Sequence, residues 1–263
     1  MRLAVWSGPR NLSTALMYAF ANRVDFSAVD EPFYAAYLKL SGLKHPMVQE
    51  ILASQTQDPT EVVKALLAPI GASHRHLYHK HMTQHMIPGI PRDWMREVEN
   101  VFLIRHPIRV VASFARKYEN PTLADLGFLQ QESLFEGLRA QGQTPLVIDS
   151  ADILLNPERA LRRLCAALGL GFDPAMLSWP AGGMSCDGVW AAHWYGAVHR
   201  SNGFSAAEAD PLPDLPDHLK ALADQAMPAY DALAPFCLRP SPEPDRGCTF
   251  DPNADLHRSA THA

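Results

Sequence analysis

The sequence predicts an α/β fold of three layers, in which a central, mostly parallel sheet lies between helices. Apolar runs of strand length alternate with amphipathic segments of helix length, and the first run leads through a loop directly into a helix. The chain has 263 residues, of which 47% are hydrophobic and 19% charged, so it can bury one substantial core without disulfides or a structural metal. This composition excludes fibrous, disordered and small disulfide-stapled proteins. We expect one domain, 1–239, followed by a Pro-rich, flexible tail, 240–263.

Strand and helix signals alternate through the first part of the chain. The apolar run at 3–6 stops at a Ser-Gly-Pro turn, and the segment after it places Leu16, Met17 and Phe20 on one face of a helix. In order, we expect a strand at 3–6, a helix at 13–23, a second strand at 27–31, one or two amphipathic helices within 46–70 that break near Asp58-Pro59, and a weaker strand at 77–80.

The second part of the chain continues the alternation and then changes in composition. We expect a strand at 101–104, a helix at 110–118, a strand at 145–149 and a helix at 157–168 that ends at Gly169. After Ser205 the sequence holds nine of its 22 prolines, and only 219–233 has a helical pattern. From about Pro240 onward, too few apolar residues remain to offset the entropy of ordering the chain.

Charge and cysteine usage exclude several classes of protein. The net charge of −5 disfavours nucleic acid as a partner, whereas 74–117 carries eight Lys and Arg against three Asp and Glu, which indicates a focused anion site. The four cysteines form no C-x-x-C pair, so zinc ribbons and thioredoxin-like chemistry are disfavoured. No apolar run is long enough to cross a membrane, and the N-terminus lacks a secretory pattern. We therefore expect a cytoplasmic protein with no membrane span, and the sequence leaves an oligomer open.

The loop between the first strand and the first helix predicts a phosphate site, because the N–H groups at a helix N-terminus attract anions. Against the Walker pattern, Ser13 stands where the second glycine belongs and no lysine follows it, which disfavours an ATP or GTP hydrolase. A cation, Arg10, precedes the hydroxyls of Ser13 and Thr14, an arrangement that suits a phosphate without catalytic magnesium. The alternative is that a hydroxyl only caps the helix and Gly-Pro only makes a turn. The candidate binding residues are Gly8, Pro9, Arg10, Asn11, Leu12, Ser13 and Thr14.

A second anion site is predicted at the end of the strand at 101–104. Arg105 follows this strand, and Ser113 lies eight residues later in the next helix. Both then face the crevice at the carboxyl ends of the strands, where open α/β sheets bind ligands. For Arg105 alone a surface ion pair would be the simpler interpretation, but beside the first loop the two sites would flank one nucleotide.

Together with a third segment, these motifs resemble the sulfotransferases that use 3′-phosphoadenosine-5′-phosphosulfate (PAPS). The third segment is 145–179, with Val147-Ile148-Asp149-Ser150 and the helix after Asn156-Pro157. The resemblance implies that Arg10, Ser13 and Thr14 hold the 5′-phosphosulfate and that Arg105 and Ser113 hold the 3′-phosphate. It also implies transfer of a sulfuryl group to a hydroxyl or amine of a small molecule or carbohydrate, with 3′,5′-diphosphoadenosine as product and no metal.

The sequence departs from this family at several positions. Arg10 and Leu12 stand where lysine and glycine are usual, and Ser150 stands where many relatives have a tyrosine near the adenine. The usual Arg-Lys-Gly lid over the 3′-phosphate is missing. The aromatic and basic segment 190–203, which includes Arg200, is a candidate replacement, and the alternative for it is an aromatic edge of the core.

Sulfuryl transfer needs a base for the acceptor's proton and positive charge at the leaving oxygen. Glu31 follows a predicted strand and resembles the glutamate of carbohydrate-type members, so we favour it as the base over His81, which lies in a Lys-His segment similar to that of cytosolic members. Lys80 is the first candidate to assist the leaving phosphate, and Arg10 the second. A kinase-like phosphate-handling protein and a catalytically inactive nucleotide-binding module are the alternative functions.

Overall fold

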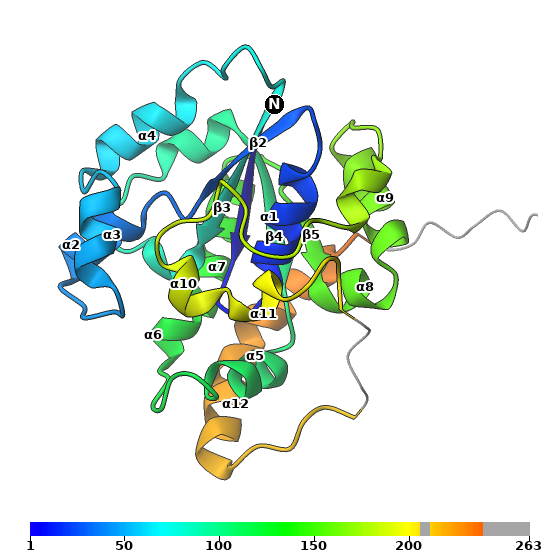
Figure 1. Cartoon of the computed structure of the whole chain (residues 1–263). Helices are drawn as coiled ribbons and strands as arrows, with labels where there is room; N and C mark the ends of the chain where they lie inside the picture. Colours follow the sequence, from blue (N-terminus) through cyan, green and yellow to red (C-terminus); the bar gives the residue numbers. More distant parts are fainter. Residues whose placement is uncertain (206–210, 239–263) are drawn as a thin grey trace, which may run out of the picture.

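The computed structural model describes residues 1–205 and 211–238, and its centre is a parallel five-stranded sheet (Figure 1). The strand order is β2-β3-β1-β4-β5, and every neighbouring pair is parallel. The strands are β1 (Arg2–Ser7), β2 (Phe26–Asp30), β3 (His76–Met82), β4 (Glu99–Ile104) and β5 (Leu146–Asp149). The predicted α/β class is confirmed, and each of these strands overlaps one that the sequence predicts.

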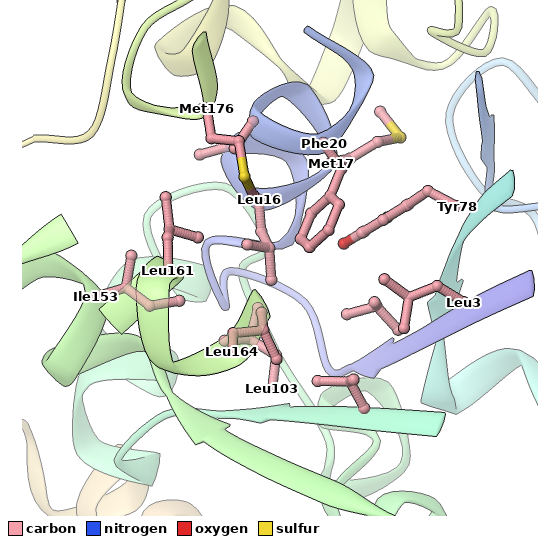
Figure 2. Packing of buried hydrophobic residues seen from close by; sticks show 14 of the residues in the cluster. Leu3, Leu16, Met17, Phe20, Tyr78, Leu103, Ile153, Leu161, Leu164 and Met176 are labelled. Atoms are coloured by element: carbon pink, nitrogen blue, oxygen red, sulfur yellow. The ribbon is translucent and has the colours of Figure 1, made fainter. Parts of the chain in front are cut away.

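Helices cover both faces of the sheet, because successive side chains of a buried strand point to opposite sides. Leu3 and Val5 of β1 pack with α1 (Ser13–Ala21) and α9 (Pro157–Ala167), as Figure 2 shows for Leu16, Phe20, Leu161 and Leu164. Ala4 and Trp6 of the same strand pack on the other face with α4 (Pro59–Leu67) and α7 (Phe128–Ala140). The three layers predicted from the sequence are therefore present.

The remaining helices surround the carboxyl ends of the strands. Four of them, α2 (Tyr34–Ser41), α3 (Val48–Ser54), α10 (Ala191–Trp194) and α11 (Gly196–His199), share a cluster of buried aromatic and aliphatic side chains. A further cluster joins α5 (Pro107–Phe114) and α6 (Leu123–Leu126) to α12 (Asp217–Leu233), and α8 (Ser150–Leu155) follows β5. The 3₁₀ turns are Thr83–His85, Asp93–Glu97, Pro174–Leu177 and Ala234–Phe236.

Local chemistry explains where several helices begin. The predicted break near Asp58-Pro59 is confirmed: the Asp58 side chain accepts a hydrogen bond from the Thr60 N–H, and Pro59 occupies the first turn of α4. The helix predicted at 110–118 instead spans Pro107–Phe114, because proline fits a first turn and His106 Nδ1 accepts from the Ile108 N–H. The sequence did not predict α2 or α7.

The tail predicted at 240–263, with Cys248, lies outside the described residues, so the domain boundary stays a prediction. Among the residues that are described, Cys165 and Cys186 are free thiols.

Candidate active site

A cavity of about 390 Å³ opens at the carboxyl ends of the strands, where the topology predicts a ligand site. Residues that follow four different strands line it: Ser13 after β1, Glu31 after β2, Met82 at the end of β3 and Arg105 after β4. Segments far apart in the chain therefore meet here because their strands are parallel and adjacent.

The loop after β1 has a backbone shaped to receive an anion. Arg10 and Leu12 are non-glycine residues in the left-handed region, with φ of 59° and 64°. Alternation of this kind turns successive N–H groups toward one side and makes an anion-binding concavity. Leu12 is the N-cap residue of α1, so neither Ser13 nor Thr14 occupies the cap position, and both hydroxyl residues line the cavity. The arrangement favours the phosphate-site interpretation over the simple cap.

Two residues of this loop have structural roles. A Cβ on Gly8 would lie 2.4 Å from the backbone oxygen of Leu126, so only glycine lets the loop approach α6 this closely. Asn11 is buried, and its side-chain N–H group donates to the Leu103 carbonyl over 2.6 Å, which fastens the loop to β4.

The two predicted anion-binding elements are in direct contact. Arg10 Nε donates to Ser113 Oγ over 3.0 Å, and the Arg105 guanidinium donates to the Arg10 carbonyl. Burial, together with the like charges of Arg105 and Arg116, lowers the pKa of Arg10. A site that gathers positive charge in this way favours a polyanionic ligand.

A buried cluster of ionisable groups lies beside these elements. Asp30 pairs with Lys80 across β2 and β3, which brings Lys80 Nζ within 2.9 Å of Asp30 Oδ1 and 2.5 Å of Glu31 Oε1. Lys80 Nζ also donates to the Tyr195 hydroxyl over 2.7 Å, and that hydroxyl lies 3.0 Å from Glu31 Oε1. Lys80 is 1% exposed and Glu31 7% exposed, so these groups interact with little screening by water.

Burial and charge act in opposite directions on these groups. Burial raises the pKa of Glu31, as does the charge of Asp30, although the Lys80 ammonium opposes the shift. Burial alone would lower the pKa of Lys80, but the carboxylates of Asp30 and Glu31 outweigh it and hold that pKa above its usual value. The result is a charged lysine between two carboxylates, one of which holds its proton more tightly than an exposed glutamate does.

The structure separates the two candidate bases, Glu31 and His81. Lys80, which contacts Glu31, and His81 are consecutive residues of β3, so the side chains of Lys80 and His81 point to opposite faces of the sheet. His81 stacks on Trp6 with ring centroids 4.2 Å apart and is 2% exposed, and burial holds its pKa well below the usual range. As a correction to the sequence-based candidate, His81 is a neutral core residue, and the cavity lining includes Glu31 and Lys80 instead.

The segment 190–203 fits both interpretations drawn from its sequence. Trp194, Tyr195 and Ser201 line the cavity, whereas Trp190 is 1% exposed and donates from Nε1 to the Tyr195 hydroxyl over 3.1 Å. Arg200 is exposed, and its predicted contact with the nucleotide stays a prediction.

Sequence reasoning missed several residues of this site. Asp30 stands directly before Glu31 at the end of a predicted strand, and that position was a usable signal. Tyr195 lies in the aromatic segment, but nothing in its spacing predicts contact with residues 164 and 165 positions earlier in the chain.

Within 1–205 and 211–238, no group of three or more His, Cys, Asp or Glu side chains is arranged to hold a metal ion. Over the same residues, no helix has both the length and the apolar character needed to cross a membrane.

Known proteins resemble this chain in sequence and in structure. Branched-chain-amino-acid aminotransferase-like proteins 1 and 2 of Arabidopsis thaliana are 38% and 36% identical to it over 228 residues, which cover 87% of this chain and 40% of each relative. The chain thus spans less than half the length of these relatives.

Solved structures share the fold. A sulfotransferase domain from the Synechococcus PCC 7002 olefin synthase has a TM-score of 0.59 at 18% identity and covers 89% of this chain and 94% of its own. A sulfotransferase from Alicyclobacillus acidocaldarius has a TM-score of 0.55 at 13% identity, covering 91% and 96%. A sulfotransferase domain from the curacin biosynthetic pathway has a TM-score of 0.52 at 18% identity, covering 86% and 96%. A family model described as a sulfotransferase domain matches residues 1–236, and the chain therefore belongs to the sulfotransferase family.

Proposed function

We propose that this protein transfers a sulfuryl group from PAPS to a hydroxyl or amine of a small-molecule or carbohydrate acceptor. One observation supports the proposal: two cationic elements, joined by the Arg10–Ser113 hydrogen bond, share a cavity with the buried Glu31–Lys80 pair. The first part suits a doubly phosphorylated nucleotide, and the second suits proton transfer.

The donor's two anionic groups match the two elements of the site. Ser13, Thr14 and the N–H groups at the start of α1 would hold the 5′-phosphosulfate, because the helix dipole and the loop backbone favour negative charge there. Arg105 and Ser113 would hold the 3′-phosphate. Arg10 of the first element donates to Ser113 of the second, so its charge can act on either phosphate.

In the transfer step, Glu31 accepts the proton of the acceptor's O–H or N–H group. The acceptor atom forms a bond to sulfur, and the bond between sulfur and the bridging phosphate oxygen breaks, which releases 3′,5′-diphosphoadenosine. Glu31 then carries the proton until solvent removes it.

The contacts of Lys80 distinguish between the two cations considered for the leaving phosphate. A lysine ammonium has three N–H donors, and those of Lys80 are directed to Asp30, Glu31 and Tyr195. We therefore assign Lys80 to the orientation of Glu31, and Arg10 to the negative charge that develops on the leaving phosphate.

Titration calorimetry tests the proposal. The chain should bind 3′,5′-diphosphoadenosine more tightly than ATP with magnesium, and Arg105→Ala should weaken binding of the diphosphate about tenfold or more, because charge-assisted bonds to phosphate are lost. Arg159→Ala, on the exposed side of α9, is the matched control and should bind as the parent does.

Two outcomes would contradict the proposal. Unchanged affinity in Arg105→Ala would mean that the nucleotide binds elsewhere. Sulfuryl transfer that stops in a chelator and returns with magnesium, or tighter binding of ATP with magnesium, would favour the kinase-like alternative.

A further inference from the structure

Aromatic side chains make up much of the cavity wall that the donor site does not use. The rings that line it are Tyr34 and Tyr37 of α2, Phe114 of α5, Tyr118 of the segment after α5, and Trp194 of α10. Phe114 and Tyr118 stack with ring centroids 5.3 Å apart. Aromatic faces carry negative charge density and attract organic cations that approach them.

A carboxylate lies among these rings. Asp125 of α6 lines the cavity. Burial raises the pKa of Tyr37 and lowers that of His45, and the nearby charge of Asp125 adds to the first shift and opposes the second. Its Oδ2 accepts two hydrogen bonds from Thr122, from the backbone N–H at 2.8 Å and from the hydroxyl at 2.7 Å, which caps α6. Within the described chain, Oδ1 accepts no hydrogen bond, and Asp125 forms no ion pair.

Among the described residues that line the cavity, no cation is paired with Asp125. Burial lowers the pKa of His45 and His85, so both are neutral at pH 7. His85 lies between the rings of Tyr34 and Tyr37, with centroids 4.5 Å and 4.7 Å away. The lysine and arginine side chains that line the cavity are Arg10, Arg105 and Lys80, which belong to the anion site and the Glu31 cluster.

We propose that the acceptor carries a cationic ammonium group, which binds between Asp125 and the rings of Tyr37 and Tyr118. This inference rests on the proposed function and names its acceptor class. The ammonium group is a recognition element and is not the sulfated atom, because a charged nitrogen has no lone pair to attack sulfur. The hydroxyl of the same molecule is the nucleophile, and it delivers its proton to Glu31.

A pair of probes that differ only in charge tests this inference. Choline and 3,3-dimethylbutan-1-ol have the same shape, with a quaternary nitrogen in one and a quaternary carbon in the other. Their affinities are measured by calorimetry or ligand-observed NMR on the full chain, with and without 3′,5′-diphosphoadenosine. Choline should bind at least about tenfold more tightly than the neutral alcohol, from cation–π and carboxylate contacts together.

The variant Asp125→Asn then tests whether the charge of Asp125 binds the ammonium group. The amide oxygen can still accept the hydrogen bonds from Thr122, so the cap is kept while the charge is removed. The variant should weaken choline binding about tenfold and leave the neutral alcohol within about twofold. Asp58→Asn is the matched control, because Asp58 also caps a helix but lies away from the cavity. Melting temperatures of both variants check that the fold is intact.

Several results would overturn the inference: equal binding of the two probes, no measurable binding of choline, or choline affinity unchanged in Asp125→Asn. The diphosphate titration separates this failure from failure of the proposed function. A protein that binds the diphosphate through Arg105 but shows no preference for the cation keeps its function and loses the acceptor class. A protein that prefers the cation but does not bind the diphosphate loses the proposed function instead.

Discussion

Lys80 is a buried cation whose three N–H donors all have partners in the site. An ammonium group that is 1% exposed is stable only if its lost hydration is replaced, and Asp30, Glu31 and Tyr195 supply that replacement within 3 Å. Removing one partner of such a buried pair commonly costs about 3–5 kcal/mol, since an uncompensated charge remains. Stability and the orientation of Glu31 therefore depend on the same contacts.

Glu31→Gln tests the role of Glu31 without removing these contacts. The amide oxygen can still accept from Lys80, but it cannot take a proton, so single-turnover rates should fall about 10²–10⁴-fold while affinity for 3′,5′-diphosphoadenosine is kept. His81→Phe is the control, because it keeps a ring against Trp6 and removes the titratable nitrogens. If His81→Phe loses the rate and Glu31→Gln keeps it, the assignment of the base is wrong.

The raised pKa of Glu31 has a signature in the pH dependence of activity. A base works when deprotonated, so kcat/KM should rise with pH through the Glu31 pKa, with a midpoint above the roughly 4.3 of an ordinary glutamate. At pH values between the ordinary and the raised pKa, Glu31 is protonated in the folded state more than in the unfolded state. The contribution of Glu31 to stability is therefore largest below the ordinary value and falls as the pH rises through the raised one.

A pH–rate profile of the parent and of Glu31→Gln checks this expectation. The rise of kcat/KM with pH should be absent from the residual activity of the variant. A rise in the parent with its midpoint at or below the pKa of an ordinary glutamate would contradict the expectation.

At the scale of elements, the sequence predicted those whose pattern is local. The strands and α1, α3, α4 and α9 have apolar runs, caps or amphipathic spacing that identify them. The sequence did not predict helix α2 because Tyr34 to Leu38 are all buried, so the helix has no polar face there. The sequence did not predict helix α7, partly because a polar residue, Gln131, interrupts the apolar pattern of its buried face. The Gln131 amide donates to the carbonyls of Trp6 and Leu103.

The loop after β1 depends on one close approach that substitution can test. In Gly8→Ala the added Cβ would meet the Leu126 carbonyl, so the loop or α6 must shift. We expect a loss of about 1–3 kcal/mol in the free energy of unfolding and weaker binding of the diphosphate, because the shift moves the N–H groups of the anion site. Denaturant unfolding and calorimetry measure the two effects.

Gly137→Ala is the matched control for this substitution. Gly137 lies inside α7, nothing lies within 4 Å of its would-be Cβ, and alanine should therefore stabilise the protein by about 0.5–1 kcal/mol. A Gly8→Ala protein that is as stable as the parent and binds the diphosphate equally well would show that the loop tolerates the change.

For the whole molecule, the site follows from topology. Arg10, Glu31, Lys80 and Arg105 are distant in sequence, but adjacent parallel strands bring the residues at their carboxyl ends together. By this rule the sequence predicts that Arg10 and Arg105, the candidate anion-binding residues, lie at one cavity, and both line it. The rule does not say whether Lys80 or His81 faces the cavity, because that depends on which helices pack on each face of β3. It also does not place Tyr195 or Asp125 at the cavity, because both come from segments outside the sheet.

The last part of the described chain packs against β5, an edge strand of the sheet. The Leu238 N–H donates to the Val147 carbonyl over 2.9 Å, Arg163 donates to the Leu238 carbonyl over 3.2 Å, and Phe236 packs on Phe135 with centroids 5.2 Å apart. These contacts join the last described residues to β5, α9 and α7. The folded unit therefore extends at least to Leu238.

Truncation tests the domain boundary predicted from composition. A chain that ends at Arg239 keeps every contact just described, so it should melt within about 1 °C of the full chain and bind 3′,5′-diphosphoadenosine equally well. A chain that ends at Leu233 loses the hydrogen bonds of Leu238 and the packing of Phe236. At about 1 kcal/mol for each such loss, its melting temperature should fall by several degrees. If the chain that ends at Arg239 melts as low as the shorter one, residues 240–263 contribute to the folded core, and the predicted boundary is wrong.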